Sequence, residues 1–223
     1  MKGCRRRLTR GSDSKMPAGK GSETLQVHRM LPRVKTLGPG LRLALWVQGC
    51  FRRCPGCITP DSRPLDGGRQ QTVSEIAAAF LREPGHEGIT ISGGEPFLQA
   101  GALCRLIDLI REQRDCGVIV YTGYTLEELQ ESGAPADAAE LLRRTDLLID
   151  GPYIRELNDD ASLRGSSNQR VICLTERYRN DIGLYGVKDR RDIEIRWTQD
   201  GLFIAGIPSK TTVRLQLPER DET

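Results

Sequence analysis

Hydrophobic positions follow two different spacings along this chain, and the switches between them predict its secondary structure. Short continuous apolar runs, which are typical of buried strands, cover residues 41–47, 88–92, 117–121, 147–150 and 170–174. Apolar positions at helical spacing cover residues 76–82, 98–114 and 135–144, and a further helix begins at 125. Strands that alternate with helices in this way predict an α/β protein with a largely parallel sheet.

Residues at the ends of these segments support the assignments. The sequences Thr72-Val73-Ser74-Glu75 and Thr125-Leu126-Glu127-Glu128 match the capping box that opens a helix. Before the first apolar run, residues 25–31 predict an edge strand, and we expect Pro32 to stop it because proline has no N–H for the sheet.

The number of alternating units sets the expected architecture. Five or six βα units are too few to close an eight-stranded barrel, so we expect an open, partial TIM-like βα barrel of about six units. Functional groups are then expected at the carboxyl ends of the parallel strands. The length of 223 residues fits one domain over residues 23–223, ending in a hairpin over 193–205 that turns at Asp200-Gly201.

Composition and charge narrow the class of protein. Residues 1–22 carry seven basic residues and one acidic residue, a net charge of +6, so the remaining chain carries −3 of the total of +3. We expect residues 1–22 to be a disordered basic tail, with a role as an RNA- or partner-contacting arm left open. The mildly acidic body predicts no nucleic-acid surface, and the absence of an apolar run of ~18 residues predicts no membrane partner. Seven cysteines, three of them within eight positions, favour reduced thiols in the cytoplasm over a secreted disulfide framework.

Three cysteines follow the strand over 41–47 in the pattern C-x-x-x-C-x-x-C: Cys50, Cys54 and Cys57. Closely spaced thiolates at a strand end can surround one metal centre. Structural zinc sites and four-iron clusters each have four positions to fill, so three ligands leave one position for a substrate or cofactor. A C-x-x-C redox pair formed by Cys54 and Cys57 is an alternative. A zinc site with one further ligand is another, with candidates at Cys104, Cys116 and His28.

A second motif, Gly93-Gly94-Glu95-Pro96, follows the strand over 88–92. Paired glycines let backbone N–H and C=O groups approach a ligand because no Cβ stands in the way. Taken alone, the same residues could form an ordinary turn between a strand and a helix. The position at a strand end, downstream of the cysteines, favours a ligand site.

In this order the two motifs resemble the signatures of the radical S-adenosylmethionine (SAM) enzymes. Glycine at position 56, before the last cysteine, makes the chain similar to the short glycyl-radical-activating type, in particular the activating enzymes of anaerobic ribonucleotide reductase. Three further stretches agree with that group, over residues 120–124, 148–151 and 165–170. The resemblance covers roughly residues 28–175, and residues 176–223 remain unmatched.

The resemblance implies a role for each matched residue. Cys50, Cys54 and Cys57 would bind three irons of a [4Fe–4S] cluster whose fourth iron binds SAM, and no catalytic residue is expected beyond the cluster. Ile58 would form an apolar wall near the adenine ring. The implied SAM-binding residues are Gly56, Cys57, Ile58, Gly93, Gly94, Glu95, Thr122 and Asp150.

The resemblance also implies a reductive reaction. A flavodoxin or ferredoxin would supply one electron, and SAM would be cleaved to methionine and a 5′-deoxyadenosyl radical. Because an open barrel cannot enclose that radical, a partner protein, a glycyl radical enzyme such as anaerobic ribonucleotide reductase, would cover the site and give up a hydrogen atom from a glycine. Two other functions stay open: the same chemistry on a peptide or small molecule, and a non-enzymatic iron–sulfur or zinc module.

Overall fold

A computed structural model of the chain describes residues 24–185, 187, 191–198 and 201–209. The expected basic tail over 1–22 and Asp200 of the expected hairpin turn lie outside these residues. Within the described part of the chain, none of the helices has the length and apolar character that a membrane crossing requires.

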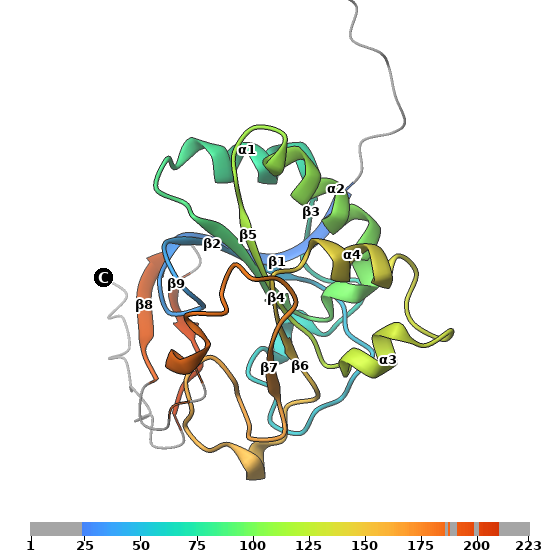
Figure 1. The fold of residues 1–223 in the computed structure, drawn as a ribbon, viewed down its shortest axis with the longest axis vertical. Helices are drawn as coiled ribbons and strands as arrows, with labels where there is room; N and C mark the ends of the chain where they lie inside the picture. The colour runs from blue at the N-terminus through green and yellow to red at the C-terminus, as the bar shows by residue number, and fades with distance from the viewer. Residues whose placement is uncertain (1–23, 186, 188–190, 199–200, 210–223) are drawn as a thin grey trace, which may run out of the picture.

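Seven strands form one open, mixed sheet in the order β3-β1-β2-β4-β5-β6-β7 (Figure 1). The four central strands are parallel neighbours: β2 (Arg42–Val47), β4 (Gly88–Gly93), β5 (Gly117–Tyr121) and β6 (Leu147–Asp150). The outer strands pair antiparallel with their neighbours: β1 (Thr24–Val34), β3 (Arg69–Thr72) and β7 (Arg170–Cys173).

The α/β class is therefore confirmed, but the count of five or six βα units is wrong for the described residues, which contain four parallel strands. The connection from β6 to β7 explains part of the difference. It contains only the 3₁₀ helix η3 (Arg155–Leu157) in place of a crossover α-helix. Without such a crossover, β7 returns antiparallel to β6.

Four α-helices connect the strands: α1 (Val73–Arg82), α2 (Ala100–Arg111), α3 (Leu126–Gln130) and α4 (Ala138–Arg144). Both predicted capping boxes are confirmed, since Thr72 accepts from the Glu75 N–H at 3.2 Å and Thr125 accepts from the Glu128 N–H at 3.2 Å. Three further 3₁₀ helices lie in loops: η1 (Pro60–Ser62), η2 (Pro96–Gln99) and η4 (Ile182–Leu184).

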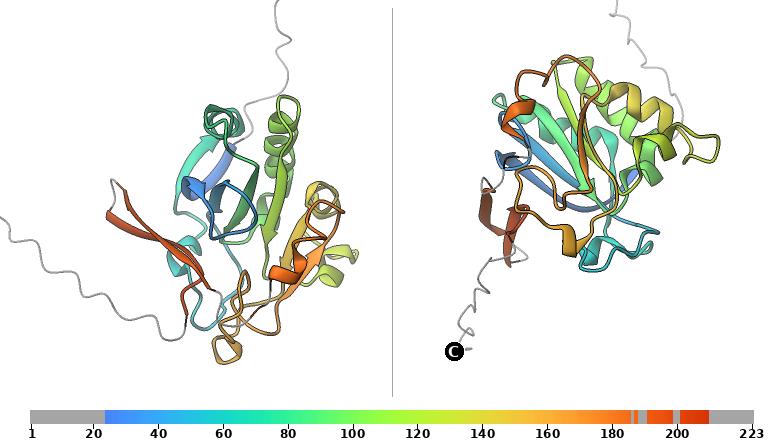
Figure 2. Two further views of the ribbon diagram at one scale, coloured as in Figure 1. Left: turned by 60° about the vertical axis from the view of Figure 1, so that its left-hand side comes forward. Right: turned by 60° about the horizontal axis from the view of Figure 1, so that its bottom comes forward.

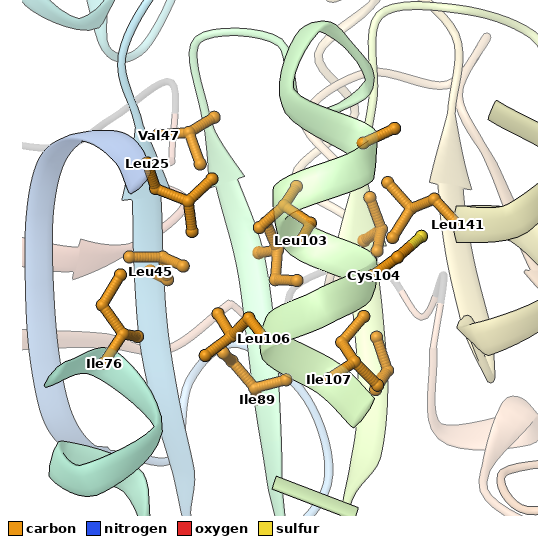
Figure 3. Close-up of a cluster of buried hydrophobic side chains, with 14 of the residues drawn as sticks. Leu25, Leu45, Val47, Ile76, Ile89, Leu103, Cys104, Leu106, Ile107 and Leu141 are labelled. Atoms are coloured by element: carbon orange, nitrogen blue, oxygen red, sulfur yellow. The ribbon is translucent and has the colours of Figure 1, made fainter. Parts of the chain in front are cut away.

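All four α-helices pack on one face of the sheet, which we call the helix-covered face. In β2, Leu43, Leu45 and Val47 point to this face, and Ile89 of β4 and Val118 of β5 belong to the same apolar cluster. Figure 3 shows Leu45 and Ile89 from the strands meeting Ile76 of α1 and Leu106 of α2. Burial of these apolar side chains drives the packing of the helices on the sheet.

The opposite face, which we call the open face, carries none of the α-helices of the described residues. Alternate positions of β2 place Ala44 and Trp46 here, where they pack with Ala205. Ala205 belongs to a hairpin of β8 (Ile193–Thr198) and β9 (Gly201–Gly206), which pair antiparallel (Figure 2). The Trp46 and Phe203 rings meet edge to face with centroids 5.1 Å apart, so the hairpin is attached to the open face of β2.

One expectation for β1 is wrong, and one strand at the sheet edge was not foreseen. Strand β1 continues past Pro32 to Val34, because Pro32 falls at an irregularity in the pairing of β1 with β2 between Leu31 and Val34, where a strand tolerates proline. Strand β3 was not predicted from the sequence. Its residues, Arg69–Thr72, are polar, and backbone pairing with β1 forms the strand without an apolar pattern.

Candidate cluster loop and cofactor cavity

The three cysteines lie in residues 49–59, the cluster loop, which leaves the carboxyl end of β2. The Gly49 N–H donates to the Ser62 carbonyl at 2.8 Å, and the Cys50 N–H donates to the Arg63 carbonyl at 3.0 Å. A turn at the other end brings the Cys57 N–H within 3.2 Å of the Cys54 carbonyl. These bonds fold the loop back on itself, so the three cysteines stay on one short segment above the sheet.

Gly93 and Gly94 hold the end of β4 directly against the start of the cluster loop. The Gly94 N–H donates to the Val47 carbonyl at 2.8 Å, and the Glu95 N–H donates to the Gly49 carbonyl at 2.8 Å. A Cβ on Gly94 would lie 2.2 Å from the Gly49 oxygen, and a Cβ on Gly93 would lie 2.4 Å from the Val47 oxygen. Glycine is therefore required here for backbone contact between two segments of the chain.

Glu95 is buried and joins the end of β4 to the end of β5. Its carboxylate accepts hydrogen bonds from the Thr122 hydroxyl at 2.8 Å, the Gly123 N–H at 2.9 Å and the Phe97 N–H at 3.1 Å. Burial raises the pKa of the carboxyl group, and these three donors act in the opposite direction. The geometry gives Glu95 a positioning role, because both of its oxygens already have donors within the protein.

A cavity of about 320 Å³ opens at the carboxyl ends of the parallel strands. Its volume lies within the usual range for small-molecule sites. The cavity brings together eight of the residues that the sequence predicts for the site: Cys50, Cys54, Cys57, Ile58, Gly93, Gly94, Glu95 and Thr122. Motifs from two separate strand ends therefore meet at one site, as expected for the carboxyl edge of a parallel sheet.

The other two predicted residues, Gly56 and Asp150, are not among those that line this cavity. Gly56 packs against another segment, since a Cβ there would lie 2.2 Å from Nε of Arg155. The Asp150 carboxylate accepts from the Leu126 N–H at 2.8 Å and from Nε of Arg170 at 3.0 Å. In the structure Asp150 therefore joins β6 to the start of α3 and to β7.

The three loop cysteines are free and partly buried. Burial raises the pKa of Cys50, and negative charge on Glu95 and on the other two thiols adds to the effect. Within the described residues, no three histidine, cysteine or acidic side chains converge as they would on a single metal ion. A four-iron cluster binds each thiolate at a different iron, so sulfur atoms around one cavity fit three of its corners without meeting at a point.

The residues considered for a fourth zinc ligand lie elsewhere. Cys104 is buried in the core of the helix-covered face, and burial raises the pKa of Cys116 to about 11. Nδ1 of His28 lies 3.1 Å from the Gln48 side-chain oxygen. None of the three is among the residues lining the cavity.

Sequence reasoning missed several residues of the cavity wall. Arg52, inside the cysteine motif, lies over the Tyr124 ring at 4.5 Å and forms an ion pair with Glu128 at 2.8 Å. The proximity of Arg52 to the cysteines could have identified it. The hairpin residues Phe203 and Ile204 also line the cavity, and no motif in the sequence indicated them.

Comparison with known sequences shows the family of this chain. The family described as 4Fe-4S single cluster domain matches residues 36–172. The anaerobic ribonucleoside-triphosphate reductase-activating protein of Vibrio cholerae serotype O1 is 33% identical over 159 residues, which cover 68% of this chain and 99% of the relative. The protein of the same name from Escherichia coli strain K12 is 30% identical over 158 residues, which cover 66% of this chain and 97% of the relative.

Two other proteins match a smaller part of this chain. The pyruvate formate-lyase-activating enzyme of Clostridium pasteurianum is 33% identical over 129 residues, which cover 55% of this chain and 49% of the relative. Among solved structures, QueE from Escherichia coli aligns with a TM-score of 0.42 and 17% identity over 57% of this chain and 70% of that chain. The β8–β9 hairpin lies beyond residue 172, where the family match ends.

Proposed function

The chain belongs to the family of the anaerobic ribonucleoside-triphosphate reductase-activating proteins, which are radical SAM enzymes, and we propose that it reductively cleaves SAM to install a glycyl radical on a partner enzyme. The observation that carries this proposal is the meeting of the cluster loop and the Gly93–Glu95 motif in one cavity. The same proposal includes three further points. The fold is a partial barrel of the radical SAM type, residues 23–223 form a single domain, and the protein is located in the cytoplasm.

In this proposal Cys50, Cys54 and Cys57 bind three irons of a [4Fe–4S] cluster, and the fourth iron is left for SAM. The reduced cluster supplies the electron that cleaves SAM. The protein's own residues provide position and exclusion of water. Gly93 and Gly94 hold the cluster loop at its distance from β4, and Ile58 gives the cavity an apolar wall beside the cysteines.

The remaining predicted residues take different parts in the proposal. Thr122 lines the cavity, and its hydroxyl donates to Glu95 at 2.8 Å and accepts from the Tyr124 N–H at 3.1 Å, so one lone pair of the oxygen is left to accept from a ligand. We propose that the backbone of Gly56, next to Cys57, contacts SAM. Asp150 would act indirectly, by fixing β6 and the start of α3 at the edge of the site.

The partner and the electron donor are also proposals. Relatives that activate anaerobic ribonucleoside-triphosphate reductase and pyruvate formate-lyase support a glycyl radical enzyme as the partner. Because the cavity is open to solvent, a partner protein that covers it would protect the radical from side reactions. A flavodoxin or ferredoxin would deliver the electron.

The test is anaerobic formation of 5′-deoxyadenosine. Protein reconstituted with iron and sulfide is mixed with dithionite and SAM, and the product is followed by chromatography. We expect product from the wild type and none from Cys54→Ala, which removes a cluster ligand. Cys173→Ala is the matched control, because Cys173 is a partly buried free cysteine of β7 outside the cavity.

Two results would count against the proposal. Wild-type protein that contains its iron and sulfide but forms no product would favour a non-enzymatic iron–sulfur module. Equal loss of product in Cys54→Ala and Cys173→Ala would indicate a general effect on the protein and not a role for the cluster loop. Addition of purified anaerobic ribonucleotide reductase then tests the partner, through the appearance of an organic radical on that protein.

A further inference from the structure

The cluster loop carries a positive charge between two of its cysteines. Arg52 lies two residues after Cys50 and two before Cys54, and its side chain lines the same cavity as the three thiols. The other arginine and carboxylate side chains that line the cavity are those of Arg63 and the buried Glu95. Arg52 therefore brings a cation to the part of the cavity that holds the cysteines.

Contacts with the end of β5 and the start of α3 fix the position of this cation. Cζ of Arg52 lies 4.5 Å from the centroid of the Tyr124 ring, and Nη2 donates to the Glu128 carboxylate at 2.8 Å. Gly123 leaves room for the side chain, because a Cβ there would lie 2.5 Å from Cδ of Arg52. Since these contacts preorganise the guanidinium, its charge can act on a group in the cavity without a cost of reorientation.

The ion pair between Arg52 and Glu128 presents its positive end to the cavity. Arg52 lines the cavity and Glu128 does not, and the Glu128 side chain is 46% exposed against 27% for Arg52. Solvent therefore screens the negative partner more than the positive one. The positive charge also reaches the buried Glu95 carboxylate, where it acts against the rise that burial causes in the pKa of that group.

We propose that Arg52 raises the reduction potential of the cluster that the three cysteines bind. Reduction transfers one electron from the donor protein and so adds one negative charge to the cluster, and no bond forms or breaks at Arg52. A positive charge beside the cysteines favours the reduced form, because that form is the more negative one. This inference rests on the proposed function, which supplies the cluster and the electron donor.

The test is a redox titration of the anaerobically reconstituted protein without SAM, followed by electron paramagnetic resonance. In Arg52→Gln we expect the ratio of reduced to oxidised cluster at a fixed potential to fall by about tenfold, a shift of about 59 mV for one electron. Arg52→Lys keeps the charge and should restore most of the wild-type potential. Arg105→Gln is the matched control, because it removes the same charge from an exposed position of α2, and its potential should equal that of the wild type.

A second variant separates the effect of charge from the effect of loop position. Glu128→Gln breaks the same ion pair but removes a negative charge, and glutamine can still serve in the capping box of α3. We therefore expect its potential to stay the same or rise. If Arg52 only held the loop in place, Arg52→Gln and Glu128→Gln would loosen the same contact and shift the potential in the same direction.

The variants also decide the case in which Arg52→Gln does not hold its cluster. A fall of the potential in Glu128→Gln, or in Arg52→Lys as large as the one expected for Arg52→Gln, would then overturn the inference. Values at or above that of the wild type in Glu128→Gln, with a near-normal value in Arg52→Lys, would support it.

An unchanged or higher potential in Arg52→Gln would overturn the inference and leave the proposed function intact, and so would equal falls in Arg52→Gln and Glu128→Gln. Failure of the wild type to form an iron–sulfur cluster is a different result. It would remove the proposed function, and this inference with it.

Discussion

The two faces of the central sheet differ in what covers them and in what they bury. The helix-covered face is closed by four α-helices, which bury a large cluster of apolar side chains against the sheet. The open face is covered by the hairpin and by loops, and it buries polar side chains such as Arg42, Thr90 and the Tyr121 hydroxyl. Both faces are built from the same strands, because successive side chains of a strand point to opposite sides.

This difference shows how one small sheet can have a stable core on one face and a cavity for chemistry on the other. Along β2, Leu43 and Leu45 enter the apolar core while Arg42 and Trp46 face the other side. Regular helices cover the first side. The second side is filled only in part, and the cavity is the space left between the strand ends, the cluster loop and the hairpin.

The largest effect that we predict comes from the buried polar network of the open face. Arg42 is fully buried, and Arg42→Ala would leave its acceptors without donors, so we expect a loss of about 5 kcal/mol in unfolding free energy. The acceptors are the Thr90 and Tyr178 hydroxyl groups and the carbonyl groups of Pro39, Ile89 and Gly117. Urea denaturation measures the change, and a loss below about 1 kcal/mol would show that this network contributes little.

The next largest effect tests the apolar packing of the helix-covered face. Phe80 of α1 is fully buried, and Phe80→Ala should reduce the unfolding free energy by about 4 kcal/mol through lost burial and a new cavity. The affinity for SAM should stay unchanged once the variant is folded, because Phe80 lies on the opposite face from the cavity. A specific loss of SAM affinity would contradict the separation of the two faces.

The same substitution on the hairpin provides the matched comparison. Phe203 is only partly buried, packed on Trp46 at 5.1 Å and under the Arg29 guanidinium at 4.6 Å. Phe203→Ala should cost about 1 kcal/mol in urea denaturation. It should weaken SAM binding more than Phe80→Ala does, since Phe203 lines the cavity. Equal stability losses in the two phenylalanine variants would remove the distinction between a filled face and a partly filled one.

The smallest effect is a pH dependence at the helix-covered face. His86 is buried, its Nε2 accepts from the Arg33 N–H at 3.1 Å, and burial lowers its pKa below the ordinary value of 6.5. Folding therefore favours the neutral ring, so the stability that it contributes is present above pH 6.5 and is lost as pH falls through the lower folded pKa. Unfolding free energies between pH 5 and 8 should fall more steeply toward acid in the wild type than in His86→Gln. Parallel curves would rule out this contribution.

The sequence predicted the helix-covered face well because regular spacing encodes it. The apolar runs of β2, β4, β5 and β6 and the capping box at Thr72 appear in the structure near their predicted positions. The strands at the two edges of the sheet were harder to predict. Strand β3 has no apolar pattern, and the antiparallel return of β7 depends on the length and packing of a loop.

For the candidate site, the sequence predicted which motifs meet, because both follow parallel strands that end at one edge of the sheet. It did not predict how each residue is used. The hydrogen bonds of Glu95 and Asp150 within the protein and the hairpin wall at Phe203 depend on contacts between distant segments. No local pattern encodes such contacts.

The central claim is that a cluster held by Cys50, Cys54 and Cys57 meets SAM in the cavity of the open face. The most direct test is the electron paramagnetic resonance spectrum of the anaerobically reconstituted, dithionite-reduced protein before and after addition of SAM. We predict a cluster signal in the wild type whose g values change when SAM is added, and loss of that signal in Cys54→Ala. A cluster signal that SAM leaves unchanged, or one that persists undiminished in Cys54→Ala, would contradict the claim.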